Sequence, residues 1–393
     1  MKSIWILLAL AISAFAIGST EFISIGLLPL IKQEFNVSLY SAGLTVSLYA
    51  LGVTIGAPIL TAITSGMQRK KVLILVMCTF IIGNFIAAFS TTFNLLLIGR
   101  IVSAFAHGVF MSIAALIATD VVKPNKRASA IAIMFSGLTI ATITGVPLGT
   151  WIGEITSWRI SFVFIACIGI IGLITNMILI PENLSKSNKI TLKDMKTVLT
   201  NPRMLLIFII TAIGYGGTFV MYTYLSPILQ QVLHFSPSTI VILLVFYGIF
   251  VAIGNVIGGK TSNNNTLYSL FIMFMILSFL LLLLYFVMNS SYISLFVIFS
   301  IGLFMFMNVP GLQLFAVQTA EKYISNATLM ASALNISSFN IGIFAGSYIG
   351  GMVVQYYSLG VTTIYASVMV MIATFIIAIW LFTDKHYVHS IKE

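Results

Sequence analysis

Charged residues are scarce in this sequence, and their scarcity argues against a water-soluble globular protein. Only 7% of the 393 residues are Asp, Glu, Lys or Arg, against about 25% in an ordinary soluble domain. Hydrophobic residues make up 60%. The composition predicts an all-α polytopic membrane protein, because a chain of this length has room for about a dozen helices of about 20 apolar residues each.

Cysteine is also rare, and no metal-binding or catalytic pattern stands out. The two cysteines, Cys78 and Cys167, both fall inside apolar runs, which disfavours a disulfide framework and a cysteine-based metal site. The sequence has no H-E-x-x-H pair and no convincing serine or aspartate dyad. We therefore expect no enzyme activity, no metal and no cofactor.

Twelve long apolar runs predict twelve transmembrane helices. The first begins at Ile4 and is too long for the apolar core of a secretory signal, so we expect it to span the membrane. The expected spans are 4–31, 42–65, 71–91, 93–119, 129–154, 158–181, 204–232, 238–259, 266–288, 292–319, 328–355 and 360–382.

The connection at 182–203 is the only long one, and it has six spans on either side. We expect an N-terminal six-helix bundle at 1–181, a basic cytoplasmic linker at 182–203 and a C-terminal six-helix bundle at 204–393.

The positions of lysine and arginine predict the orientation. Of the 19 such residues, all but three lie in segments that share one side of the membrane if the N-terminus is cytoplasmic. The exceptions are Lys32 and Arg159 on the other side and Arg100 within a span. Because positive charges concentrate on the cytoplasmic side, we expect both termini in the cytoplasm. The net charge of +10 then needs no nucleic-acid partner.

The two halves repeat each other at a nearly constant spacing, which is typical of transporters. A shift of about 198 residues pairs Thr20 with Thr218, Pro29 with Pro227, Tyr49 with Tyr247, Gly145 with Gly342 and Gly149 with Gly346.

Three stretches, with the six-plus-six layout, resemble the major facilitator superfamily over nearly the whole chain. They are Ser19-Thr20-Glu21-Phe22 with Gly26-Leu27-Leu28-Pro29, Arg100 with Ala106-His107-Gly108, and Gly145-Val146-Pro147-Leu148-Gly149-Thr150. They are similar to the drug:proton antiporter group, most of all to the sugar- and arabinose-efflux permeases and the purine and chloramphenicol exporters. The resemblance implies two pseudo-symmetric bundles, a monomer in a bacterial plasma membrane, and a proton gradient as energy source.

The loop between spans 2 and 3 departs from the family pattern Gly-x-x-x-Asp-Arg-x-Gly-Arg-Arg. Here the basic residues Arg69, Lys70 and Lys71 are present and the aspartate is not. Asp120 at the end of span 4 is a possible substitute partner. The span 5 residues Gly145, Pro147 and Gly149 correspond to the family's antiporter motif, altered by Val146.

Glu21, Arg100 and His107 are the ionisable residues expected deep in the membrane, where such groups are costly and need a partner or a function. By helix rise, Glu21 lies about 5 Å and Arg100 about 9 Å to the external side of the centre, with His107 near the middle. If spans 1 and 4 are neighbours, the three form one cluster suited to proton coupling. Alternatively, Glu21 and Arg100 form a static ion pair, and His107 is a neutral hydrogen-bonded residue. Glu154 and Arg159 are expected to form a surface pair.

The second half lacks these charges but keeps a polar and aromatic lining. Gly214–Gly217 and Asn308–Gly311 are expected to interrupt spans 7 and 10, and such interruptions point to a binding site. The candidate substrate residues are Tyr215, Phe219, Tyr222, Phe304, Asn308 and Phe315. Packing is the alternative role for the aromatic ones.

Together these features predict a proton-coupled secondary transporter that exports a small organic solute such as a sugar, a nucleoside or purine, or a drug. A proton:solute symporter of the same fold, working as an importer, is the alternative. A channel or a membrane-embedded enzyme fits the sequence less well.

Overall fold

The computed structural model describes residues 2–64, 66–122, 127–182, 192–262, 265–324 and 328–383. Every element assigned within these ranges is a helix. In the described part of the chain, twelve helical stretches are long and apolar enough to cross a bilayer, which confirms the predicted all-α polytopic fold. A helix suits this environment because it satisfies its own backbone hydrogen bonds where no water is present.

The chain divides into two compact units, Met1–Thr191 and Leu192–Glu393. Unit 1 contains six long helices. They are α1 (Lys2–Phe35), α2 (Leu39–Thr64), α3 (Arg69–Ala88), α4 (Phe93–Asp120), α5 (Arg127–Ile155) and α6 (Trp158–Leu179).

Unit 2 begins with a short helix that the sequence analysis did not predict, within the expected linker 182–203. This helix, α7 (Leu192–Leu199), packs against two long helices of its own unit, α8 and α13. The remaining elements are α8 (Pro202–Tyr222), α9 (Leu225–Pro227), η2 (Ile228–Val232), α10 (Pro237–Thr261), α11 (Thr266–Val287), α12 (Ser291–Tyr323), α13 (Thr328–Tyr356) and α14 (Thr362–Thr383).

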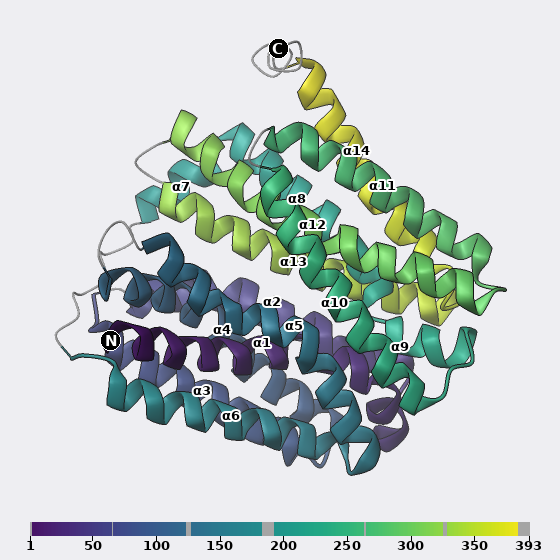
Figure 1. Ribbon diagram of the computed structural model, residues 1–393, viewed down its shortest axis with the longest axis horizontal. Coiled ribbons are helices and arrows are strands. Elements are labelled where there is room, and N and C mark those ends of the chain that lie inside the picture. Colours follow the sequence, from purple (N-terminus) through teal and green to yellow (C-terminus); the bar gives the residue numbers. More distant parts are fainter. Residues whose placement is uncertain are drawn as a thin grey trace. The chain divides into compact units, whose positions relative to one another are not determined.

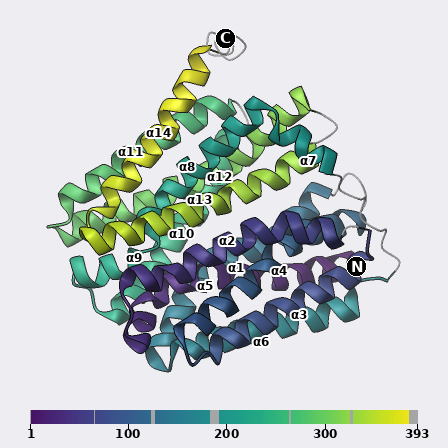
Figure 2. The ribbon, with the colours of Figure 1, turned by 180° about the vertical axis from the view of Figure 1, so that it is seen from behind.

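Helix neighbours within the two units follow the same pattern, as the predicted repeat requires (Figures 1 and 2). In unit 1, α1 packs against α5 and α6, and α4 packs against α2 and α3. In unit 2, α8 packs against α13 and α14, and α12 packs against α10 and α11. Thus α1 corresponds to α8, and α4 to α12.

The expected interruptions at Gly214–Gly217 and Asn308–Gly311 are absent, which corrects the sequence interpretation. Helix α8 runs through its glycines, and α12 runs through Pro310. The seventh span instead breaks at Thr223 and Tyr224 and continues as α9 and the π-helical turn η2. Pro227 explains this position, because a proline ring clashes with the carbonyl four residues earlier, here that of Thr223.

Glycines bring α8 and α13 into backbone contact within unit 2. A side chain at Gly216 would meet the backbone of Gly342, and one at Gly346 would meet the carbonyl of Gly216. Small residues at helix interfaces permit this close approach. The resulting van der Waals packing holds membrane helices together, because no hydrophobic driving force acts between them in lipid.

Candidate functional site

Arg100 on α4 is completely buried and is held by main-chain carbonyls from two other helices. Its Nη1 donates to the Thr20 carbonyl of α1 at 2.7 Å, and its Nε donates to the Thr45 carbonyl of α2 at 3.0 Å. Its Nη2 donates to the carbonyl of Glu21 at 3.3 Å. A guanidinium presents its donors in a rigid planar fork, so this one residue joins α1, α2 and α4.

The carboxyl group of Glu21 takes no part in this arrangement. The ion pairs found among the described residues are Arg69–Asp120, Lys70–Glu182 and Arg159–Glu34. Arg100 therefore contacts the backbone of residue 21, and the static ion pair considered from the sequence is not formed. The half-buried Glu21 side chain remains beside a buried positive charge. The cation favours the charged form of the carboxyl group, and the apolar surroundings favour its protonated form.

Tyr49 on α2 connects Arg100 to His107. The guanidinium carbon of Arg100 lies 4.2 Å from the centre of the Tyr49 ring, and the Tyr49 hydroxyl lies 3.3 Å from Nδ1 of His107. Sequence analysis placed Glu21, Arg100 and His107 in one cluster but did not include Tyr49. The available signal was its repeat partner Tyr247.

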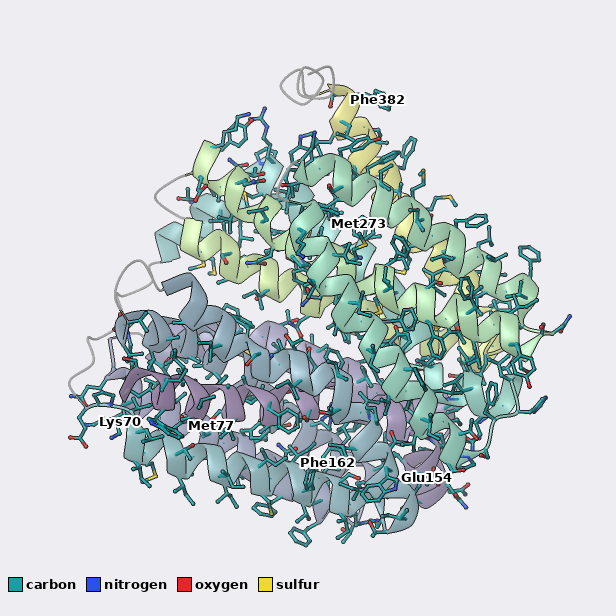
Figure 3. The ribbon with its side chains drawn as sticks, in the orientation of Figure 1. Lys70, Met77, Glu154, Phe162, Met273 and Phe382 are labelled. Atoms are coloured by element: carbon teal, nitrogen blue, oxygen red, sulfur yellow. The ribbon has the colours of Figure 1, made fainter. Side chains whose placement is uncertain are left out.

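A second aromatic ring lies near Arg100. The guanidinium carbon is 5.8 Å from the ring centre of Phe162 on α6. In Figure 3, Phe162 lies between Lys70 and Glu154, which mark opposite ends of unit 1. Arg100 and Phe162 are both completely buried, so the site lies inside the bundle, and cation–π attraction replaces part of the lost hydration of Arg100.

The basic residues that begin α3 form one close ion pair. Arg69 contacts Asp120 at the end of α4 through Nη1 and Oδ2, so the structure brings together the two residues matched from the sequence. Lys70 lies 3.9 Å from Glu182, and Lys71 is exposed. The pair connects the start of α3 to the end of α4.

The residues singled out in span 5 lie at the contact between α5 and α1. A side chain at Gly145 would meet Ser19, and one at Gly149 would meet Ile23. Pro147 lies within α5, which continues past it. The motif packs α5 against the part of α1 that carries Glu21.

The expected pair of Glu154 and Arg159 is wrong. Arg159 Nη1 lies 2.7 Å from Glu34 at the end of α1, and its Nη2 donates to the carbonyl of Ser90 at 3.0 Å. Its guanidinium also lies 4.4 Å from the ring centre of Trp158. Arg159 in the first turn of α6 therefore contacts the end of α1 and not Glu154 of α5.

Tyr215, Phe219 and Tyr222 on α8 form a continuous aromatic stripe in unit 2. Ring centres are 5.3 Å apart for the first two and 5.4 Å apart for the last two. Tyr222 stacks on Tyr247 at 5.3 Å. The stripe extends to α12 and α13, because Phe306 and Phe339 both contact Tyr215.

The other three candidates for substrate binding lie on α12 in different surroundings. Phe304 is half-buried, whereas Phe315 is buried and packs on Trp380 at 5.1 Å. Asn308 is completely buried; its amide nitrogen donates to the Phe304 carbonyl at 3.3 Å, and its Oδ1 has no partner. Asn308 thus offers an unused acceptor, while Phe315 has a packing partner. In the part of the chain that the structure describes, no three His, Cys, Asp or Glu side chains gather as metal ligands.

Comparison with known proteins agrees with this architecture. Residues 10–330 match the family model described as Major Facilitator Superfamily. The chain is 52% identical over 347 residues to the MFS-type transporter YtbD of Bacillus subtilis, covering 88% of each. It is 29% identical over 357 residues to a probable sugar efflux transporter of Helicobacter pylori, covering 89% of this chain and 88% of that protein.

A solved structure shares the fold. The crystal structure of a D-xylose-proton symporter superimposes with a TM-score of 0.80, covering 98% of this chain and 99% of that one. The sequence identity is 14%, so the likeness concerns the fold alone.

Proposed function

This chain belongs to the major facilitator superfamily, and we propose that within it the protein is a proton-coupled secondary transporter that exports a small organic solute. The family and the relatives are transporters and not enzymes. The proton gradient supplies the energy, and alternating access moves the solute.

The arrangement around Arg100 carries the proposal. Three carbonyls and two rings hold the guanidinium, and the carboxyl of Glu21 stays unpaired with it. A carboxyl in apolar surroundings beside a cation is balanced between its two protonation states. A change in water access or in its distance from Arg100 would shift that balance. Glu21 is the proton-carrying residue in this proposal, Arg100 modulates it, and His107 either relays the proton or binds solute.

The solute is a sugar, a nucleoside or purine, or a drug. The relative named as a probable sugar efflux transporter supports a sugar and the export direction. The aromatic stripe from Tyr215 to Tyr222 offers flat apolar surfaces, and Asn308 offers an acceptor. Aromatic rings with a few placed polar groups are typical of small-molecule sites.

The protein acts as a monomer in the plasma membrane of a bacterium, with both termini in the cytoplasm. The bias of lysine and arginine to one side supports this orientation, and the relatives are bacterial. The ion pair between Arg69 and Asp120, with Lys70 and Lys71 beside it, lies at the cytoplasmic end and steadies one conformational state.

Reconstitution in liposomes with an imposed pH gradient tests the coupling. The panel consists of radiolabelled L-arabinose, D-glucose, inosine and chloramphenicol. We expect Glu21→Gln to abolish gradient-driven transport of the active panel member and to retain exchange of labelled for unlabelled solute. The matched control is Glu154→Gln, the same change at an exposed position of α5. Gradient-driven transport at the wild-type rate in Glu21→Gln would refute the assignment.

Direction needs a separate measurement. Cells that carry the protein should accumulate less of the active solute than cells without it. Greater accumulation would support the symporter that works as an importer.

A further inference from the structure

Tyr49 makes two different contacts, one through its aromatic ring and one through its hydroxyl group. Its ring lies 4.2 Å from the Arg100 guanidinium carbon, and its hydroxyl lies 3.3 Å from His107 Nδ1. Arg100 and His107 are seven residues apart on α4 and share a face, about 10 Å apart along the helix. Tyr49 belongs to a buried cluster with Val53 and Ala104, a residue of α4 between Arg100 and His107, and only 1% of Tyr49 is exposed.

The cation on the ring favours the Tyr49 hydroxyl as the donor in its hydrogen bond with His107. A guanidinium over an aromatic face draws on the electron density of the ring, and a phenol with less electron density is a better donor than acceptor. The Tyr49 hydroxyl therefore donates, and His107 Nδ1 accepts. An accepting Nδ1 carries no proton, which leaves the proton of the neutral ring on Nε2.

The remaining surroundings of His107 favour its neutral form over the imidazolium. Helix α4 packs against α1, α2, α3 and α5. Away from the helix ends, the titratable groups of these four helices are Glu21, Tyr49 and Cys78, and Arg100 adds one positive charge on α4 itself. A second positive charge on His107 would share this interior with Arg100.

Nε2 of His107 is left for another partner. Within the described ranges Nε2 makes no hydrogen bond, and His107 keeps 7% of its surface exposed. In the repeat, Asn308 takes the place of His107, and an amide can form hydrogen bonds but cannot carry a proton. The shared property of the two positions is hydrogen bonding.

We infer that Tyr49 is the positioning residue that fixes His107 as a neutral Nε2–H donor toward the transported solute and leaves Glu21 as the proton carrier. The inference rests on the proposed function and chooses between the two roles left open there for His107. It also assigns the solute an acceptor atom, such as a hydroxyl, carbonyl or ring nitrogen.

Nitrogen-15 NMR of histidine-labelled protein in detergent tests the tautomer without any solute. The chain has 4 histidines, and loss of a signal pair in His107→Gln assigns the resonances. At pH 7 we expect an unprotonated Nδ1 and a protonated Nε2. An imidazolium, or a proton on Nδ1, would overturn the inference.

Tyr49→Phe keeps the ring over Arg100 and removes only the hydroxyl. We expect the two nitrogen shifts of His107 to move toward each other as the tautomers mix. The control is Tyr247→Phe, because the hydroxyl of this repeat partner donates to the Met305 sulfur and not to His107. Unchanged His107 shifts in Tyr49→Phe would remove Tyr49 from the role.

Transport of the active panel solute separates donor from proton carrier. His107→Gln keeps a donor, so we expect the KM to rise about three- to tenfold with the pH profile and the gradient dependence retained. A pH profile that becomes flat, as expected for Glu21→Gln, would make His107 a proton carrier. If instead Glu21→Gln leaves transport unchanged, the proposed function fails, while the NMR result on Tyr49 and His107 still stands.

Discussion

Arg100 is a buried cation that is stabilised without a carboxylate in contact. Its donors meet the carbonyls of Thr20, Glu21 and Thr45, and its flat faces meet the rings of Tyr49 and Phe162. These carbonyls also belong to regular helices, so α1 and α2 provide acceptors without being interrupted. The planarity of the group matters as much as its charge.

Arg100→Lys should therefore destabilise the protein although it conserves charge. A lysine ammonium is a compact and strongly hydrated point charge that cannot reproduce the fork or the stacking. We expect a loss of about 2 kcal/mol or more, from charge-assisted hydrogen bonds that are lost or bent. Thermal unfolding of the detergent-solubilised protein measures it. Lys260→Arg, the reverse exchange at an exposed lysine of α10, is the control and should change the melting temperature little; equal losses in both would contradict the account.

At this scale the sequence predicted the charged residues better than their partners. Hydropathy makes Glu21, Arg100 and His107 conspicuous, because each is costly within an apolar run. Tyr49 is amphipathic and ordinary in such a run, so apart from its repeat partner Tyr247 only its contacts single it out. Arg159 was assigned the wrong partner because Glu154 is near in sequence, whereas Glu34 is near in space.

Close glycine contacts determine how pairs of helices within a unit approach. In unit 2, Gly216 of α8 faces the backbone of Gly342 and Gly346 of α13. In unit 1, Gly145 and Gly149 of α5 face α1. The corresponding helix pairs in the two units therefore use the same device.

Gly216→Ala should be harmful even though alanine is the best helix former. Its methyl group would overlap the backbone of Gly342, and overpacking of this kind costs about 1–3 kcal/mol. Gly259→Ala is the matched control, because its methyl group would meet only Pro310 at 3.9 Å. Thermal melts should rank Gly216→Ala below the wild type and Gly259→Ala near it. The reverse order would show that the contact is less tight than described.

The pair of Arg69 and Asp120 joins two helices of unit 1 at one end. Asp120→Asn should lower the transport rate of the active panel solute severalfold, because the neutral amide holds the guanidinium less firmly. The charge swap Arg69→Asp with Asp120→Arg should recover part of the rate. A double-mutant cycle should give a coupling free energy of about 1 kcal/mol. Additive effects of the two single changes would show that the pair has no functional role.

Helix boundaries followed from apolar runs, but the break in the seventh span did not. Glycine was given weight as an interrupter, yet α8 runs unbroken through Gly214–Gly217, and its glycines there let α11, α13 and α14 pack closely against it. Pro227 breaks its helix, whereas its repeat partner Pro29 lies inside an unbroken α1. A membrane helix tolerates proline when its neighbours satisfy the freed backbone groups. These neighbours are known only from the folded structure, so the sequence does not show which proline breaks its helix.

For the whole molecule, the sequence predicted twelve spanning helices and their division into two similar sets of six. Run length and repeat spacing suffice for this, because bilayer thickness dictates helix length. Helix α7 was missed because its eight residues are too few to span and lie in a polar segment. It became visible only through its packing on α8 and α13.

The orientation of the chain can be checked with fusions. Green fluorescent protein attached after Glu393 should fluoresce, because it matures in the cytoplasm. Alkaline phosphatase inserted in the turn at His234 and Phe235, between η2 and α10, should be active, because it needs the external side. The opposite pattern would show that the bias of lysine and arginine does not set the orientation.

The carbonyl cradle of Arg100 has an electrical consequence. Carbonyls carry no net charge, so the positive charge of Arg100 is not cancelled by a contacting anion. On the proposed mechanism, each proton taken up by Glu21 then changes the net charge of the buried site by one unit. A charge that crosses the whole membrane experiences about 2.3 kcal/mol for every 100 mV of potential. The membrane voltage, and not the pH gradient alone, therefore acts directly on the site where α1, α2 and α4 meet.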